Sequence, residues 1–295
     1  MRGRVSRCVT VAAAVTVCLA GVLATTASAA AAPGAGPDRG AGTAPASVQP
    51  DLVGGTPADQ TYPFMASLQE KGEHVCGAAL VRPTWLVTAA HCVHEPGGQD
   101  GASQDPGPLT ARIGSNDRTS GGEVAEAAEV VVHPSFEYPG STGDIALIRL
   151  GEPASARPID LATADDQPDN PPSGDGAPTD PGTATRLLGW GQTCPENGCG
   201  EAPVTLQQVD TQVVDDERCG AGFDAASEVC TDNPDGAGAC YGDSGGPQLV
   251  RAGERWRLVG MSSRAGNNDP VCGSGPSIYT SAPAYTEWIE ETTAG

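Results

Sequence analysis

The chain has 295 residues and a formal net charge of −21, from 16 basic and 37 acidic residues. Such an acidic surface repels nucleic acid and anionic membranes, so neither class of partner is expected. The charge favours solubility outside the cell and does not indicate a fold.

The first 51 residues are predicted to be absent from the working protein. Three early arginines precede an apolar run from residue 9 to residue 23, and Ala27-Ser28-Ala29 offers a cleavage site. This order is typical of a secretory signal peptide over residues 1–29, so the product is expected to be secreted and extracellular. Residues 30–51, rich in Ala, Gly and Pro, are predicted to be a pro-segment or spacer.

Residues 52–295 are long enough for one large all-β domain or two small barrels around one cleft. Their apolar segments are short and bounded by Gly, Pro, Asn or Asp, as strands are in all-β proteins. Examples of such segments are 78–81, 129–132, 145–150, 186–188 and 256–261. Residues 164–185 hold many Pro, Asp and Gly and are predicted to be an exposed linker between two halves.

One short helix is predicted at the C-terminal end of the chain. Ser281 is able to cap it, and Tyr285, Trp288 and Ile289 follow at helical spacing. These three side chains therefore share one face of the helix.

Eight cysteines follow the signal segment, and an even number in an exported chain indicates disulfides. They are Cys76, Cys92, Cys194, Cys199, Cys219, Cys230, Cys240 and Cys272. A zinc site at Cys194 and Cys199 would need two further Cys or His ligands close by, which the sequence does not supply. We therefore expect disulfides, with no metal and no other cofactor.

A serine stands between glycines in the segment Gly242-Asp243-Ser244-Gly245-Gly246-Pro247. Glycine permits backbone angles that aim consecutive N–H groups at one point, where they stabilise a developing oxyanion. Ser244 is therefore a candidate nucleophile. A glycine-rich turn without any catalytic role is the alternative interpretation.

The histidines decide between classes of enzyme, because a serine hydroxyl needs a base to take its proton. All four histidines, at positions 74, 91, 94 and 133, precede Ser244. An α/β-hydrolase places its histidine after the serine, so lipases and esterases of that class are excluded. His91 is the candidate base, because an apolar strand runs into its turn and Cys92 anchors it. A zinc pair of His91 with His94 is disfavoured, and the other three histidines are interpreted as structural or exposed.

The third member of such a site must be a buried carboxylate that fixes the imidazole tautomer. Asp144 directly precedes the apolar segment 145–150 and is expected at the end of a barrel. Asp165, Asp166 and Asp169 lie in the predicted linker and are interpreted as solvated.

Three segments together resemble the signatures of trypsin/chymotrypsin-type serine proteases. They are Thr88-Ala89-Ala90-His91-Cys92, Asp144-Ile145-Ala146-Leu147 and Gly242-Asp243-Ser244-Gly245-Gly246-Pro247, and both their order and their intervals agree. The resemblance spans residues 52–295. It implies an all-β fold of two six-stranded antiparallel β-barrels, chymotrypsin-like, with the short C-terminal helix.

The resemblance also implies a role for each residue of the site. Ser244 attacks the scissile carbonyl, His91 accepts and returns the proton, and Asp144 orients His91. The backbone N–H groups of Gly242 and Ser244 form the oxyanion hole.

Leu52-Val53-Gly54-Gly55 resembles the start of a mature family member, with Leu where Ile or Val is usual. The freed amine of Leu52 would then insert beside Asp243. A buried charge needs its partner, so the Asp243 turn is expected to be misformed before cleavage, and the chain is predicted to be a zymogen. An ordinary Val-Gly-Gly turn is the alternative.

By the same resemblance, Cys76 pairs with Cys92, Cys219 with Cys230, and Cys240 with Cys272. The short spacing of the remaining Cys194 and Cys199 suggests a local bridge.

The resemblance gives a substrate pocket that lacks the acidic residue of trypsin. Six residues before the nucleophile stands Gly238, so cleavage after Lys or Arg is not expected. The residues assigned to the pocket are Gly238, Ala239, Tyr241, Ser263, Arg264, Ala265 and Ser277. A preference for small to medium apolar residues is predicted, and a sharper hypothesis has Arg264 attract an acidic substrate residue.

The predicted function is a secreted serine endopeptidase that acts on proteins or peptides as a monomer, with protein protease inhibitors as further partners. The alternative is a binding protein that keeps the protease fold and has lost catalysis. All three candidate residues stand in intact segments, which favours the enzyme.

Overall fold

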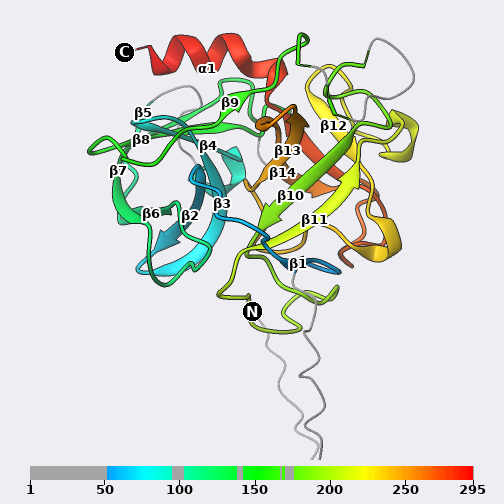
Figure 1. Cartoon of the computed structure of the whole chain (residues 1–295), viewed down its shortest axis with the longest axis horizontal. Coiled ribbons are helices and arrows are strands. Elements are labelled where there is room, and N and C mark those ends of the chain that lie inside the picture. The colour runs from blue at the N-terminus through cyan, green and yellow to red at the C-terminus, as the bar shows by residue number, and fades with distance from the viewer. Residues whose placement is uncertain (1–51, 95–102, 138–141, 167, 170–175, 295) are drawn as a thin grey trace, which may run out of the picture. The chain divides into compact units, whose positions relative to one another are not determined.

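The computed structural model describes residues 52–94, 103–137, 142–166, 168–169 and 176–294. The predicted signal peptide and pro-segment lie outside the described residues. The described strands form two sheets, one mostly from the N-terminal half and one mostly from the C-terminal half of the chain (Figure 1).

The first sheet closes into a barrel. Its strands are β2 (Met65–Glu70), β3 (Glu73–Arg82), β4 (Trp85–Thr88), β5 (Ser103–Gln104), β6 (Leu109–Ile113), β7 (Glu123–Val132) and β8 (Ala146–Leu150). They pair in the order β5-β7-β6-β2-β3-β4-β8, and an additional antiparallel pairing of β7 with β8 closes six of them into a ring. Buried and partly exposed residues alternate along β6, which is typical of a strand with one face in a core.

The second sheet follows the order β1-β11-β10-β13-β14-β15-β12. Its strands are β1 (Thr56–Pro57), β10 (Ala184–Gly189), β11 (Gln207–Gln212), β12 (Glu228–Thr231), β13 (Pro247–Ala252), β14 (Arg255–Ala265) and β15 (Ser277–Ser281). An isolated antiparallel bridge pairs Val213, just after β11, with Thr231 of β12. This bridge joins the two ends of the six-strand order β11-β10-β13-β14-β15-β12 into a ring. The short strand β9 (Asp160–Leu161) adds a parallel pairing on β14. The two six-stranded barrels predicted from the sequence are confirmed.

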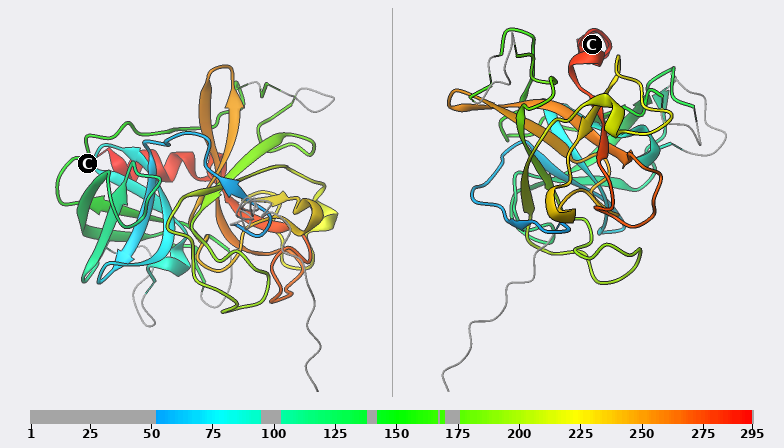
Figure 2. Two further views of the ribbon diagram at one scale, coloured as in Figure 1. Left: turned by 60° about the horizontal axis from the view of Figure 1, so that its bottom comes forward. Right: turned by 90° about the vertical axis from the view of Figure 1, so that its right-hand side faces the viewer.

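The predicted C-terminal helix is confirmed, although it begins later than expected. Helix α1 (Thr286–Thr293) follows a 3₁₀ turn at Pro283–Tyr285, while Ser281 belongs to β15 and so is not its cap. Ile289 is fully buried in the core of the first barrel. The ring of His133, just after β7, packs edge-on against the rings of Tyr285 and Trp288, each at 4.8 Å between centroids. Figures 1 and 2 show the helix lying along this barrel.

Four disulfides join the eight cysteines of the described chain. The pairs are Cys76–Cys92, Cys194–Cys199, Cys219–Cys230 and Cys240–Cys272, as the resemblance and the short spacing implied. In the same part of the chain, no helix combines the length and the apolar character needed to cross a membrane.

Three short 3₁₀ turns precede the C-terminal part of the chain, of which the first carries His91 and the third follows Asn233. They are η1 (Ala90–Cys92), η2 (Asp216–Arg218) and η3 (Pro234–Gly236). Where the predicted linker 164–185 meets β10, Thr183 and Thr185 are buried, so the end of that segment belongs to the second barrel.

Candidate active site

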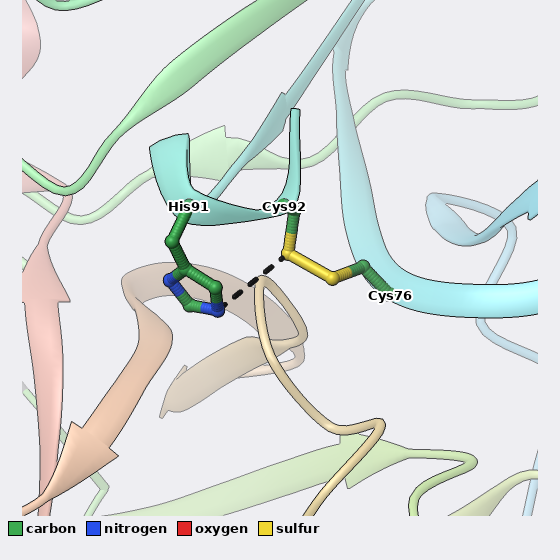
Figure 3. Close-up of side chains that lie close together, drawn as sticks. All are labelled: Cys76, His91 and Cys92. Atoms are coloured by element: carbon green, nitrogen blue, oxygen red, sulfur yellow. Dashed lines mark hydrogen bonds between the residues drawn. A yellow bond between two sulfur atoms is a disulfide. The ribbon is translucent and has the colours of Figure 1, made fainter. Parts of the chain in front are cut away.

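His91 lies on the 3₁₀ turn η1, directly after the fully buried strand β4. The neighbouring Cys92 is bonded to Cys76 of β3, so a covalent link holds this turn against the barrel (Figure 3). Donor atoms of Cys76, His91 and Cys92 lie within 4.8 Å of one another. The two sulfur atoms are bonded to each other, so this cluster offers no thiolate to a metal.

Asp144 is 3% exposed, and its carboxylate accepts three hydrogen bonds from described residues. The His91 backbone N–H donates to Oδ1 at 2.9 Å, and His91 Nδ1 and Ser263 Oγ donate to Oδ2 at 2.8 and 2.6 Å. Burial alone would raise the pKa of Asp144, but the hydrogen bonds and the charge interaction with His91 hold it below its ordinary value. An ionised Asp144 keeps the proton on Nδ1 and leaves the lone pair of Nε2 as a base. The bond from Ser263 was missed by the sequence, which assigned this serine to the pocket wall alone.

The turn that carries Ser244 packs against the turn that carries His91. Gly77 of β3 donates its N–H to the Ser244 carbonyl at 2.8 Å. A Cβ on Gly245 would lie 2.1 Å from Oγ1 of Thr88, so the close approach requires glycine there. Among the described residues, no hydrogen bond joins the Ser244 hydroxyl to His91, whose Nε2 lies 3.9 Å from Cys92 Sγ.

The candidate oxyanion donors are unoccupied within the described chain, because the N–H groups of Gly242 and Ser244 donate to no group there. Gly242 has a φ of 96°, a backbone angle suited to glycine. Gln192 donates its N–H to the Tyr241 carbonyl at 2.8 Å. In a trans peptide C=O and N–H point in opposite directions, so this bond directs the Gly242 N–H away from Gln192.

His74, interpreted from the sequence as structural or exposed, forms a hydrogen bond with the turn that carries the candidate oxyanion donors Gly242 and Ser244. Its Nε2 donates to the Gly242 carbonyl at 3.0 Å, since a carbonyl oxygen only accepts. Nδ1 then accepts from Ser67 Oγ at 2.8 Å, and Gln69 donates to the same hydroxyl at 3.2 Å. Burial lowers the pKa of His74 to about 4, so the ring is neutral at neutral pH and keeps this tautomer.

Replacing His74 by phenylalanine is expected to lower kcat on peptide substrates about tenfold, with KM nearly unchanged. The ring contact with Trp190 remains, but the Gly242 carbonyl loses its donor, so the turn that carries the N–H groups of Gly242 and Ser244 is held less firmly. The His74→Gln variant carries an amide N–H at a similar reach and is expected to recover most of kcat. Wild-type kcat in the phenylalanine variant would show that the bond does not position the turn.

The carboxylate of Asp243 is buried beneath this turn at 2% exposure. Gly191 N donates to Oδ1 at 2.7 Å and Cys240 N donates to Oδ2 at 2.9 Å. Burial raises the pKa of Asp243 to about 7, against the lowering effect of these two bonds. No ion pair to Asp243 occurs among the described residues. These two bonds hold the turn within the described chain, and the expected change of the turn on cleavage stays a prediction.

Leu52 lies with its side chain in the core of the second barrel, 1% exposed, in the cluster that includes Tyr279. Val53 forms an isolated antiparallel bridge with Gly238, and Gly238 N donates to the Val53 carbonyl at 2.9 Å. The segment that resembles a mature N-terminus is therefore docked beside the pocket residues.

A cavity of about 260 Å³ opens beside Ser244. Six of the seven residues assigned to the pocket line it, namely Ala239, Tyr241, Ser263, Arg264, Ala265 and Ser277, whereas Gly238 does not. The guanidinium of Arg264 binds both oxygens of the buried Glu228 and the Gly222 carbonyl. Its charge is paired, which removes the basis for attraction of an acidic substrate residue.

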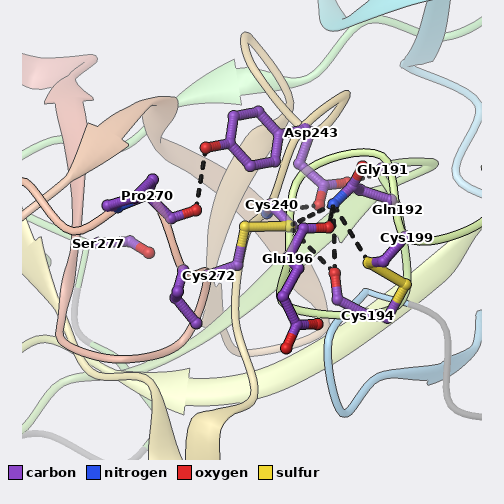
Figure 4. The surroundings of a disulfide bond; sticks show 12 residues. Gly191, Gln192, Cys194, Glu196, Cys199, Cys240, Asp243, Pro270, Cys272 and Ser277 are labelled. Carbon is purple, nitrogen blue, oxygen red and sulfur yellow. Dashed lines mark hydrogen bonds between the residues drawn. A yellow bond between two sulfur atoms is a disulfide. The ribbon is translucent and has the colours of Figure 1, made fainter. Parts of the chain in front are cut away.

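One wall of the cavity is fixed by Gln192, which the sequence did not reveal. Its side-chain Nε2 donates to the carbonyls of Cys194 and Glu196 at 3.2 and 2.8 Å, and Oε1 accepts from Gly198 N at 3.0 Å. Figure 4 shows this amide between the Cys194–Cys199 and Cys240–Cys272 disulfides. The loop closed by the first bridge is thereby held against the pocket.

Two antiparallel β-barrels of six strands with a C-terminal helix define a chymotrypsin-like fold. The family model described as Trypsin matches residues 52–289. A trypsin of Phaedon cochleariae is 31% identical over 258 residues, which cover 82% of this chain and 88% of the relative. The solved structure of neuropsin, a serine protease expressed in the limbic system of mouse brain, has a TM-score of 0.62 at 25% identity and covers 78% of this chain and 94% of its own. The chain belongs to the trypsin family of serine proteases.

Proposed function

We propose that this chain is a secreted serine endopeptidase in which Ser244, His91 and Asp144 act as a catalytic triad. The observation that carries the proposal is the pair of hydrogen bonds from His91 to the buried Asp144. They fix the tautomer in which Nε2 is free to accept a proton.

In the proposed reaction, Ser244 Oγ attacks the scissile carbonyl carbon while His91 Nε2 takes the hydroxyl proton. The oxyanion receives the N–H groups of Gly242 and Ser244. His91 then gives its proton to the leaving amine, and water repeats the sequence on the acyl-enzyme to release the new carboxylate. Catalytic hydrogen bonds often tighten only when substrate is bound, so the missing bond between Ser244 and His91 is compatible with this role.

For the substrate, we propose small to medium uncharged side chains in the pocket, and not Lys or Arg. Ala239, Ala265 and Pro276 contribute apolar lining, which supports uncharged side chains over charged ones. The carboxylate that would pair with a basic side chain is missing at Gly238. Proteins and peptides are the proposed substrates, with protein protease inhibitors as further partners of a monomer.

We also propose that the working enzyme is residues 52–295, released from the signal peptide 1–29 and the pro-segment 30–51 by a cut after Asp51. The new amino group of Leu52 would then pair with Asp243. The docked position of Leu52 and the raised pKa of Asp243 support this activation step.

Labelling with a fluorophosphonate probe tests the proposed function on the chain that begins at Leu52. The probe is expected to attach at Ser244, and the Ser244→Ala variant is the control that remains unlabelled. A wild-type chain that is folded and processed, yet neither labelled nor able to hydrolyse any member of a peptide library, would favour the catalytically silent binding protein.

A further inference from the structure

The inner end of the substrate pocket is formed by a residue that the sequence did not single out. The mouth of the cavity carries the side chains of Tyr241 and Val271, 40% and 38% exposed, whereas Ser277 is 5% exposed. Asn233 lines the same cavity and is hydrogen-bonded to Ser277. Its carboxamide therefore lies at the enclosed end.

The orientation of the Asn233 carboxamide is fixed by its partners. Nδ2 donates to the Gly275 carbonyl at 2.6 Å and to Ser277 Oγ at 3.0 Å. A carbonyl oxygen only accepts, so the NH₂ group must face Gly275 and Oδ1 must point the other way. Within the described chain the sole donor near Oδ1 is Ser277 Oγ at 3.3 Å, which leaves one lone pair of Oδ1 for a ligand.

Oδ1 occupies the volume that a side chain at position 238 would need. A Cβ built on Gly238 would lie 2.0 Å from Oδ1 and 2.4 Å from Cγ of Asn233. Any side chain there would displace the carboxamide. The polar group at the inner end of the pocket therefore comes from Asn233 and not from residue 238.

The inner end carries no unpaired charge among the described residues. The charge of Arg264 is paired with Glu228. Asp269 lies at the mouth and not at the inner end, because its Oδ1 accepts a hydrogen bond from the N–H of Val271, a residue of the mouth. A substrate side chain that reaches the inner end therefore meets a neutral hydrogen-bond acceptor.

We propose that Asn233 determines the specificity of this pocket and selects uncharged side chains of medium length that end in a hydrogen-bond donor, such as glutamine. This inference rests on the proposed protease function. An apolar side chain of the same length would bury Oδ1 without a hydrogen-bond donor, which costs free energy. A pocket with a buried acceptor therefore discriminates against a substrate that lacks the matching donor. A Lys or Arg side chain would bring a positive charge to the inner end, where no described carboxylate is placed to pair with it.

The test compares kcat/KM for two peptides that differ only in the residue before the scissile bond, glutamine in one and methionine of similar length in the other. The wild-type chain beginning at Leu52 is expected to favour glutamine about tenfold. Asn233→Ala is expected to bring the ratio close to one, because the acceptor is gone. Asn197→Ala makes the same chemical change at an exposed residue outside the pocket and is expected to keep the wild-type ratio.

Each rate is divided by the concentration of chain that the fluorophosphonate labels, so partial misfolding does not alter the ratio. Gly238→Ala serves as a second variant, because its methyl group must displace Oδ1 and is expected to lower the ratio as well. A wild-type ratio of one or less, or an unchanged ratio in both variants, overturns the role of Asn233. A wild-type chain without labelling or hydrolysis would overturn the protease function instead.

Discussion

Replacing Asp144 by asparagine is expected to lower kcat about 10⁴-fold while the fold is retained, the loss known for this change in chymotrypsin-type enzymes. If the amide NH₂ takes the place of Oδ2, it donates to His91 Nδ1, and the proton moves to Nε2. If it takes the place of Oδ1, it meets the backbone N–H of His91, donor against donor. This clash disfavours the second orientation, so the first one prevails and removes the base proposed for Ser244.

Steady-state kinetics on a peptide amide, with thermal unfolding to verify the fold, measures this effect. Asp165→Asn makes the same change at an exposed aspartate in the linker and is expected to leave kcat unchanged. Ser263→Ala removes one of the three bonds to Asp144 and is expected to have a much smaller effect. An Asp144→Asn enzyme with kcat within tenfold of wild type would contradict the proposed triad.

The uncut chain is expected to lose stability as pH rises from 4 to 8. Folding raises the pKa of Asp243 from its ordinary 3.8 to about 7, so the folded chain holds a proton that the unfolded chain releases in this range. The stabilisation is complete below pH 4 and is lost as pH rises through 7. About three pKa units correspond to a loss on the order of 4 kcal/mol in the free energy of unfolding.

Urea unfolding with disulfides intact, at several pH values, measures this loss. The Ser244→Ala background prevents self-cleavage of a chain that keeps residues 30–51. In the chain that begins at Leu52, the proposed pairing of the new ammonium group with Asp243 is expected to make the fall with pH much smaller. Repulsion among the many acidic groups also changes with pH, because the net charge is −21. The Asp243→Asn variant of the uncut chain keeps this repulsion and lacks the contribution of Asp243. An equal fall with and without Asp243 would refute the proposed linkage.

The sequence predicted the barrels and the candidate triad because both depend on local patterns. Short apolar segments between turn residues define strands, and the segments around His91, Asp144 and Ser244 keep their order and spacing. The strands predicted at 78–81 and 186–188 lie within β3 and β10.

Contacts between distant segments were beyond the reach of sequence patterns. Asn233 reaches the pocket through the backbone of Gly275, 42 residues away, and His74 reaches Gly242 across 168 residues. Neither residue stands in a recognisable motif. The Asp243 turn was expected to be misformed before cleavage, because a buried charge without a partner is costly. The backbone N–H groups of Gly191 and Cys240 that donate to this carboxylate were not predicted from the sequence.

The disulfide between Cys76 and Cys92 makes the position of the His91 turn depend on the redox conditions of the compartment in which the chain folds. Thiols stay reduced in the cytosol, and there the turn beside His91 would lack its covalent tether. A closure over 16 positions is worth about 3 kcal/mol in the chain-entropy picture. If the chain is an exported protease as proposed, the imidazole would be poorly held before export, and oxidation afterwards would protect the proteins of the producing cell from digestion.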